Sequence, residues 1–369
     1  MKNAAHTLLT IVVLLITAKV NAAETNIGGN LFAHWMMDLS DEADSFNEFA
    51  LERAYVDIKS TLSDYTSVRL TTDLRSADVD GSEVYNIIIK YAHVDWRPAF
   101  ANGIITLRLG IQPTHYIDMM NKLWGRRYLA KTVSDDRKFL TSSDIGAGVV
   151  FRLGEKSKTG YVAANIWNGT SYSDIEEMNK QKDFSGFFYL TPLADDPDFK
   201  LTAMQAQVYL GTQNEELGML LLDDGDTEVQ LEASDYDRRL FSLGGLLAYR
   251  NSFDVGADIN FYKAGQGRSS VDGEVLDDIS SSGYSFFGAL YLEPLVAADS
   301  PFRTLDLFGR MDVYDPDTDN EDDGETLVIV GIECAPIKGF KASVNLRGTS
   351  FQNDSDSRTE LYLNTLFKF

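Results

Sequence analysis

The residues best suited to chemistry are basic side chains in one long connecting segment, residues 113–142. This segment has six basic residues against three aspartates, although the whole 369-residue chain carries a formal charge of −23. Rings of lysine and arginine around an aqueous passage select anions, because each fixed positive charge attracts a passing anion. The candidate constriction residues are Lys122, Arg126, Arg127, Lys131, Arg137 and Lys138.

A second group of basic residues lies inside segments in which polar and apolar residues alternate. Their positions on the polar rows make them candidate lining residues of the same passage. The alternative is that each one pairs with a carboxylate on a neighbouring strand, such as Asp57, Asp73 or Asp95, and contributes little free charge. The candidate lining residues are Arg53, Arg69, Arg108, Arg310 and Arg347.

Alternating runs of strand length must position these residues, and they recur through the whole chain. The last run, 357–369, has an apolar row that ends on Phe367 and Phe369. Period-two alternation predicts strands with one apolar and one polar face. The sixteen runs lie near 27–39, 48–61, 65–74, 85–96, 103–112, 143–153, 159–168, 185–192, 199–212, 239–250, 253–263, 283–293, 304–314, 325–335, 339–352 and 357–369.

The connections between these runs separate a membrane barrel from a soluble β-sandwich. They alternate between short ones, such as 62–64 and 336–338, and long ones, such as 75–84, 213–238 and 315–324. Short periplasmic turns and long extracellular loops are typical of outer-membrane barrels. We therefore predict an all-β fold, a 16-stranded antiparallel transmembrane β-barrel in the bacterial outer membrane, with lipids around its apolar rows.

The third long connection, 113–142, is too apolar for a freely solvated loop. It contains Tyr116, Met120, Trp124, Tyr128 and Phe139 among its basic residues. A barrel of sixteen strands is too wide for side chains alone to fill. We expect this third extracellular loop to fold inward and narrow the lumen, and the alternative is that it packs outside on its neighbours.

The chain begins like a secreted protein. Lys2, the apolar stretch 7–18 and small residues up to Ala22 predict a signal peptide over 1–22, with a single barrel domain over 23–369. One cysteine excludes internal disulfides, and three mature-chain histidines argue against a histidine metal site, so we expect no metal or cofactor. The strongly acidic charge argues against a nucleic-acid partner. Spaced aspartates in 315–325 resemble calcium ligands without full EF-hand spacing, and a solvated acidic loop is the alternative.

Five short motifs give the chain a family resemblance. They are Glu52-Arg-Ala-Tyr-Val-Asp57, Tyr91-Ala-His-Val-Asp-Trp96, Leu107-Arg-Leu-Gly-Ile-Gln-Pro113, Ser143-Asp-Ile-Gly146 and Ile166-Trp-Asn-Gly169. Together with the closing Phe369, these motifs resemble the phosphate-selective porin O and P family. The resemblance implies a 16-stranded, usually trimeric, passive channel with an inward third loop. Phosphate selectivity is not carried over, because basic strand residues here are interleaved with carboxylates and the fifth outer loop is acidic.

Three functions fit these observations. The first is a non-enzymatic porin, a passive diffusion channel for small hydrophilic solutes or ions, in which the basic third loop favours anions. The second is a surface adhesin or structural barrel that uses its acidic loops. The third is an outer-membrane hydrolase, which needs a base such as His34, His93 or His115 beside a nucleophile.

Overall fold

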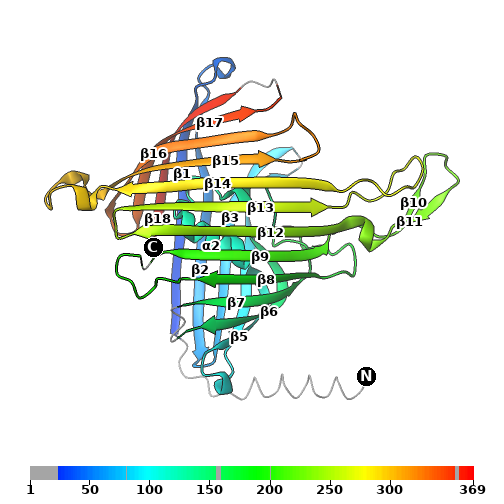
Figure 1. Cartoon of the computed structure of the whole chain (residues 1–369), viewed down its shortest axis with the longest axis horizontal. Helices are drawn as coiled ribbons and strands as arrows, with labels where there is room; N and C mark the ends of the chain where they lie inside the picture. The colour runs from blue at the N-terminus through cyan, green and yellow to red at the C-terminus, as the bar shows by residue number, and fades with distance from the viewer. Residues whose placement is uncertain (1–23, 80, 155–158, 200, 354–356) are drawn as a thin grey trace.

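The computed structural model describes residues 24–79, 81–154, 159–199, 201–353 and 357–369, so the predicted signal peptide lies outside the described residues. Sixteen antiparallel strands form one closed barrel (Figure 1). They are β1 (Glu24–Asp38), β2 (Asn47–Ser63), β3 (Thr66–Val79), β4 (Ser82–Trp96), β5 (Ile105–Pro113), β6 (Ser143–Leu153), β7 (Gly160–Trp167), β8 (Asp183–Leu190), β9 (Ala203–Thr212), β12 (Asp237–Tyr249), β13 (Phe253–Ala264), β14 (Ile279–Tyr291), β15 (Leu305–Asp315), β16 (Glu325–Ile337), β17 (Phe340–Phe351) and β18 (Arg358–Lys368).

Pairing of the first strand with the last closes the barrel. β1 runs antiparallel to β18 from the Asn30–Lys368 pair to the Asp38–Glu360 pair. Beyond the Asn30–Lys368 pair, the backbone N–H of Gly29 donates to the carbonyl of Phe369 at 3.0 Å. A side chain at position 29 would collide with the Phe369 ring, since a Cβ there would lie 2.5 Å from its nearest atom. Closure leaves the barrel without an open sheet edge, as a membrane requires.

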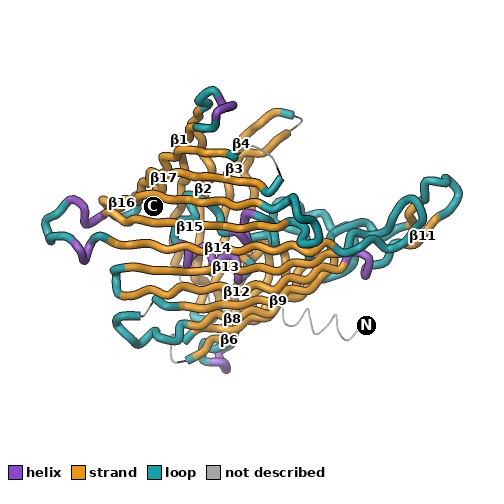
Figure 2. The backbone as a smooth tube through the Cα atoms, turned by 45° about the horizontal axis from the view of Figure 1, so that its top comes forward, coloured by secondary structure: helices purple, strands orange, loops and turns teal. Residues whose placement is uncertain are grey.

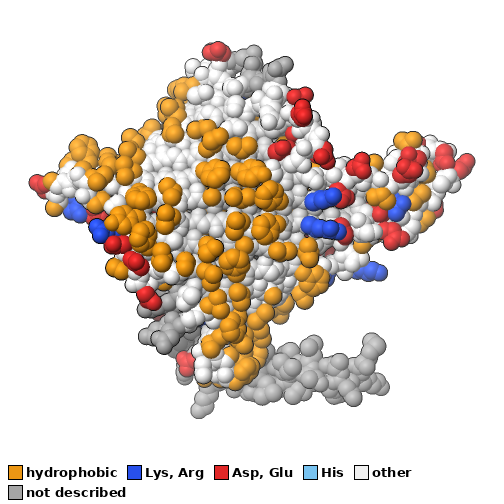
Figure 3. Space-filling view, in the orientation of Figure 1, with side chains coloured by type: hydrophobic (Ala, Val, Ile, Leu, Met, Phe, Trp, Pro, Cys, Tyr) orange, Lys and Arg blue, Asp and Glu red, His pale blue; other side chains and the backbone are white. Residues whose placement is uncertain are grey.

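The burial pattern of the strands is the reverse of that in a soluble protein, with apolar side chains outside and polar side chains inside. Side chains of the apolar rows face outward, and Leu109, Val255 and Val330 are 63%, 51% and 51% exposed. Asp258 and Glu333 on the polar rows are fully buried inside. In Figure 3, apolar side chains cover the visible wall and charged side chains gather at its two ends. Of the described residues, no helix is long and apolar enough to cross a membrane.

The ends of the barrel follow the predicted order of short and long connections, with three differences. β3 and β4 continue past the rim as paired strands up to Val79 and Ser82, so most of the loop expected over 75–84 is strand. β9 begins only at Ala203, because turns at Phe199 and Thr202 hold the chain before it. The loop 213–236 contains a two-stranded sheet, β10 (Met219–Leu221) and β11 (Glu228–Gln230), which projects beyond the barrel (Figure 1).

The third loop folds into the barrel, as the sequence predicts. Two helices form it, α2 (His115–Trp124) and α3 (Val133–Asp136), and α2 contacts β9, β12 and β13 on the far wall. In Figure 2 the helices lie behind the strands of the front wall. Short 3₁₀ turns complete the structure at η1 (Asp41–Ala43), η2 (Ala99–Ala101), η4 (Ala233–Tyr236), η5 (Glu293–Leu295) and η6 (Pro301–Thr304).

The outward row of β16 gives a test of this orientation. We expect Val330→Arg to destabilise the inserted barrel by about 2–4 kcal/mol, the cost of arginine facing lipid at mid-depth. Thr326→Arg, on the same row but near the extracellular end of β16, should cost about 0–1 kcal/mol. Urea titration of the protein in lipid vesicles measures both, and equal losses would contradict the assignment of depth and face.

Candidate functional site

Helix α2 crosses the lumen and is fastened to the wall opposite its origin. Tyr116 donates a hydrogen bond to Oδ1 of Asp258 on β13 at 2.8 Å, and both side chains are buried. Asp258 also accepts a bond from the Ser134 hydroxyl on α3 at 2.9 Å. Gln205 on β9 donates to the Tyr116 carbonyl at 3.3 Å. One wall carboxylate thus holds both helices of the loop.

The apolar side of α2 packs against aromatic residues that point into the barrel. The Trp124 ring lies 5.3 Å from Phe287 and 6.4 Å from Phe308, centroid to centroid. Gly244 on β12 makes room for the helix, because a Cβ there would approach Met120 Sδ to 2.7 Å and Tyr116 Oη to 2.9 Å. The i, i+4 spacing of Tyr116, Met120 and Trp124 was a helix signal that the strand-based analysis did not use.

A second anchor holds the turn after α2. Glu333 on β16, fully buried, accepts hydrogen bonds from Tyr128 at 2.7 Å and from Lys341 at 2.9 Å. Arg126 lies 3.8 Å from the same carboxylate, and Arg347 donates to the Leu129 carbonyl at 2.8 Å. Glu333 therefore joins the loop, through Tyr128 and Arg126, to the wall.

The structure divides the six candidate constriction residues into two groups. Arg126 is 5% exposed against β15 and β16, Arg137 pairs with Glu325, and Lys122 pairs with Asp118 at 2.7 Å. The other three border one cavity above the loop: Arg127, Lys131 and Lys138. Arg126 and Arg127 are neighbours in sequence, yet they point to different parts of the lumen.

The five strand arginines lie on lumenal rows, and four of them carry carboxylate partners. Their shortest ion-pair distances are 3.1 Å for Arg53 to Asp73, 2.8 Å for Arg69 to Asp57 and 2.6 Å for Arg108 to Asp95. Arg310 pairs with Asp312 on its own strand. Arg347 instead lies 3.6 Å over the Tyr362 ring and donates to Asn345. Much of this wall is therefore locally neutral, which was the alternative to a free basic lining.

The cavity above the loop is lined mainly by basic and hydroxyl-bearing residues. Its volume is about 360 Å³, and it is lined by residues of loop 3, of the loop after β7 and of six strands, β2, β3, β4, β9, β12 and β13. Arg53, Arg127 and Arg238 have carboxylate partners in Asp73, Glu52 and Asp183. Four further cations border it and form no ion pair with a described residue: Arg75, Lys90, Lys131 and Lys138. We call this space the basic cavity.

Asp135 of α3 is the only carboxylate among the described residues that line the basic cavity. Burial alone would raise the pKa of this carboxyl, but Arg127, Lys90 and Lys131 hold the pKa below its usual value. Its negative charge is therefore maintained, and it is shared with Arg127, whose Nε lies 3.4 Å away. The surplus of positive charge in the cavity remains after this pairing.

Sequence reasoning missed Arg75, Lys90 and Arg238 because they lie outside the third loop or at breaks in alternation. Lys90 occupies a β-bulge in β4, where Thr71 pairs with Tyr91 and Thr72 with Ile89. A second bulge, in β2, places Glu52 against Arg127. A change of phase between Ile87–Ile89 and Ala92–Val94 was the available signal, since a bulge moves the apolar row to the other parity.

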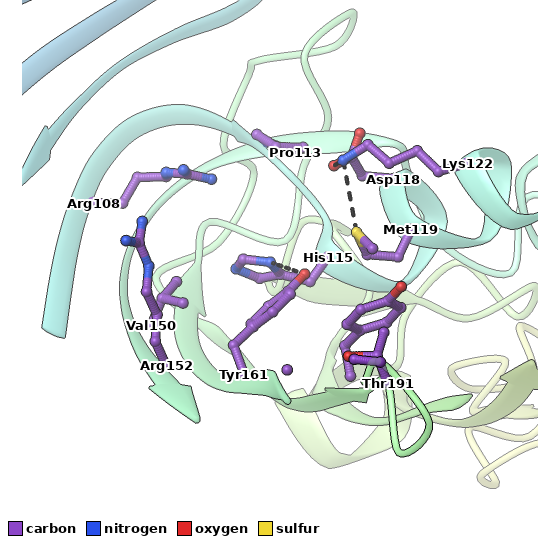
Figure 4. Close-up of a pocket in the computed structure, with 13 residues that line it drawn as sticks. Arg108, Pro113, His115, Asp118, Met119, Lys122, Val150, Arg152, Tyr161 and Thr191 are labelled. Carbon is purple, nitrogen blue, oxygen red and sulfur yellow. Dashed lines mark hydrogen bonds and ion pairs between the residues drawn. The ribbon is translucent and has the colours of Figure 1, made fainter. Parts of the chain in front are cut away.

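A second cavity lies on the other side of the loop, toward the short turns (Figure 4). It has a volume of about 590 Å³, and Arg108, Arg152, Asp118 and Lys122 border it. His115 is stacked on Phe187 and contacts the Tyr161 hydroxyl at 3.3 Å. Burial lowers the pKa of His115 to about 3, so this ring adds no positive charge at neutral pH.

The histidines and acidic residues bear on two other kinds of site, a hydrolase active site and a metal site. His93 contacts the Ile111 carbonyl and His115 the Tyr161 hydroxyl, so neither is bonded to a serine or cysteine nucleophile. Within the described ranges, no group of three or more His, Cys, Asp or Glu residues is arranged to hold a metal ion. This holds for the acidic loop 316–324 as well.

No protein-family model matches the sequence, and no curated protein matches it. Solved structures with similar folds include the outer-membrane protein OmpT of Vibrio cholerae, at 13% identity and a TM-score of 0.62 over 95% of this chain and 99% of that chain. The outer membrane channel DcaP of Acinetobacter baumannii has 12% identity and a TM-score of 0.60 over 94% and 97%. An anion-selective porin from Comamonas acidovorans has 11% identity and a TM-score of 0.58 over 94% of this chain and 100% of that chain.

At these identities the likeness shows the fold alone. Together with the closed sheet, the apolar outer face and the hydrophilic lumen, it defines a porin-like β-barrel of the bacterial outer membrane. The resemblance to the phosphate-selective porins is supported at this coarser level of the porin-like barrel and not as membership of that family.

The Tyr128–Glu333 anchor can be tested by removing one oxygen. We expect Tyr128→Phe to cost about 1.5–3 kcal/mol, the range for a hydrogen bond to a charged group, and to loosen the loop. Tyr161→Phe, which removes the neutral contact to His115, should cost about 0.5–1.5 kcal/mol. Urea titration gives the stabilities, and single-channel current noise reports loop motion. Quiet currents and full stability in Tyr128→Phe would show that the loop is held elsewhere.

Proposed function

We propose that this protein is a passive diffusion channel for small hydrophilic solutes that prefers anions. The observation that supports this most strongly is the basic cavity, which four cations without ion-pair partners among the described residues line, two from the inward loop and two from the wall. At a narrow point few waters remain to screen such charges, so they act strongly on a passing ion. The function rests on these residues more than on the paired arginines of the wall.

The extracellular loops carry the opposite charge, and distance decides which field dominates. Residues 213–238 contain nine carboxylates and one arginine, and β10 and β11 within them project away from the barrel (Figure 1). A solvated charge acts over about a Debye length, roughly 10 Å at 0.1 M salt. At moderate salt the cations beside the third loop therefore control selectivity, and the acidic loops oppose them only at low salt.

We also propose a homotrimer with outer-membrane lipids around its exposed wall. The resemblance described above supports the trimer, and one structure of Vibrio cholerae OmpT is described as a trimer form. The outward rows, including Val255, Phe261 and Leu346, support the lipid contact because they would otherwise face water. An adhesin or structural barrel is the second candidate, favoured by the projecting acidic loop.

Reversal potentials in a salt gradient test the anion preference. Wild-type channels in planar bilayers should favour chloride over potassium. Lys131→Glu combined with Lys138→Glu should shift the reversal potential toward cation selectivity, because both side chains border the basic cavity.

The matched control makes the same charge change outside the lumen. Arg239 and Lys263 are paired positions on the outward rows of β12 and β13, with side chains 68% and 54% exposed. Replacing both with Glu should leave the reversal potential nearly unchanged. Cation preference in the wild type would overturn the proposal, and the absence of conductance steps would favour the adhesin or structural barrel.

A further inference from the structure

Lys90 has an unusual position for a lysine in a barrel wall. It is the extra residue of the bulge in β4, and its side chain is 8% exposed, on the lumenal side with Tyr91 and His93. Bulges re-aim single side chains and are common beside functional sites. Burying an ammonium group is costly unless charge or hydrogen bonds compensate for it. Its surroundings therefore indicate what the position is suited to bind.

Three tyrosines surround the Lys90 ammonium. Nζ lies 5.0 Å from the Tyr55 ring, 5.2 Å from the Tyr172 ring and 5.9 Å from the Tyr91 ring. It donates one long hydrogen bond, 3.4 Å, to the Tyr55 hydroxyl. Within the described part of the chain it has no ion pair, although an ammonium group has three donors to offer. Aromatic faces stabilise the cation without neutralising it.

The neighbouring carboxylates are already used by other cations. Asp73 accepts bonds from Arg53 at 3.1 Å and from Tyr172 at 2.9 Å. Asp135 pairs with Arg127 and accepts a bond from Asn121 at 3.2 Å. Lys90 therefore keeps a net positive charge on the wall of the basic cavity, and Arg75 and Lys131 add to it without ion-pair partners among the described residues.

The rest of the cavity lining suits a ligand with hydroxyl groups. Thr141, Ser142, Thr170, Ser171 and Tyr172 border the same space. Its volume of about 360 Å³ falls in the range of small-molecule sites, about 300–1,000 Å³. Thr141, Thr170 and Tyr172 already donate to protein oxygens, so their hydroxyl oxygens can accept from sugar-like hydroxyl groups on a ligand whose carboxylate meets the cations.

We propose that the basic cavity is a binding site for small hydroxylated carboxylates, such as sugar acids, with Lys90 as the residue that receives the carboxylate. This inference rests on the proposed channel function and adds a saturable site to it. The anion would pass from the extracellular loops to this site before it moves past the third loop. Lys131 and Arg75, which also border the adjoining cavity of about 720 Å³ beside β2 and β3, would guide its approach.

Block of the chloride current by added glucuronate tests the site in the full-length protein in planar bilayers. Wild-type channels should show saturable block, with glucose as the uncharged comparison giving none. Lys90→Met, which keeps side-chain length and an apolar contact with the tyrosines, should raise the half-blocking concentration about tenfold, as expected for one lost charge-assisted hydrogen bond. Lys90→Arg should retain block.

Lys122→Met is the matched control, because it removes one lumenal lysine that is already paired with Asp118. It should change the half-blocking concentration less than about twofold. If Lys90→Met fails to insert, Arg75→Gln at its half-buried position in the same cavity provides the test and should weaken block about threefold, by losing part of the cavity's charge.

The outcomes separate this inference from the channel function. Equal effects of Lys90→Met and Lys122→Met would overturn the site, because only the total lumenal charge would then matter. Stronger block by inorganic phosphate than by glucuronate would overturn the organic class of ligand. Anion-selective wild-type channels without saturable block would overturn the site and leave the channel function standing. Cation-selective channels would overturn both.

Discussion

The structure depends on one constraint: backbone polar groups inside a membrane must find hydrogen-bond partners within the protein. A closed sheet meets this constraint, and the Gly29–Phe369 bonds at the junction of β1 and β18 complete it. Closure also fixes the side chains, because alternate residues must face lipid and lumen. Leu109 faces out and Arg108 faces in for this reason. The charged interior follows from the closed backbone.

A sixteen-stranded wall leaves a space that its own side chains do not fill, and the third loop divides that space. One side of the loop is apolar, so it needs an apolar surface to pack against within a hydrophilic lumen. Phe287 and Phe308 provide this surface. The buried carboxylates of Asp258 and Glu333 accept hydrogen bonds from the loop's tyrosine hydroxyls. The opposite side of the loop faces β2 to β4, where the basic cavity remains open.

The sequence predicts the parts of the structure that follow a regular period. Strand number, the faces of strands such as β16, and the inward third loop can all be predicted from alternation, connection lengths and loop composition. The partners of Arg53, Arg69 and Arg108 cannot, because register and tilt between strands decide which carboxylate each one meets. Lys90 was missed because a bulge removes it from the pattern on which the strand prediction relies.

Several cations without ion-pair partners among the described residues lie together in the basic cavity. Arginines on regular strand positions meet carboxylates on neighbouring rows, as Arg69 meets Asp57, and the field of each pair falls off rapidly with distance. The bulge at Lys90 and the irregular chain of loop 3 at Lys131 place cations outside that cross-strand pairing. Among the described residues, seven basic side chains and one carboxylate therefore line the basic cavity beside the loop. A strongly acidic chain can therefore enclose a cavity lined mainly by basic residues, since its excess carboxylates lie mostly in the extracellular loops.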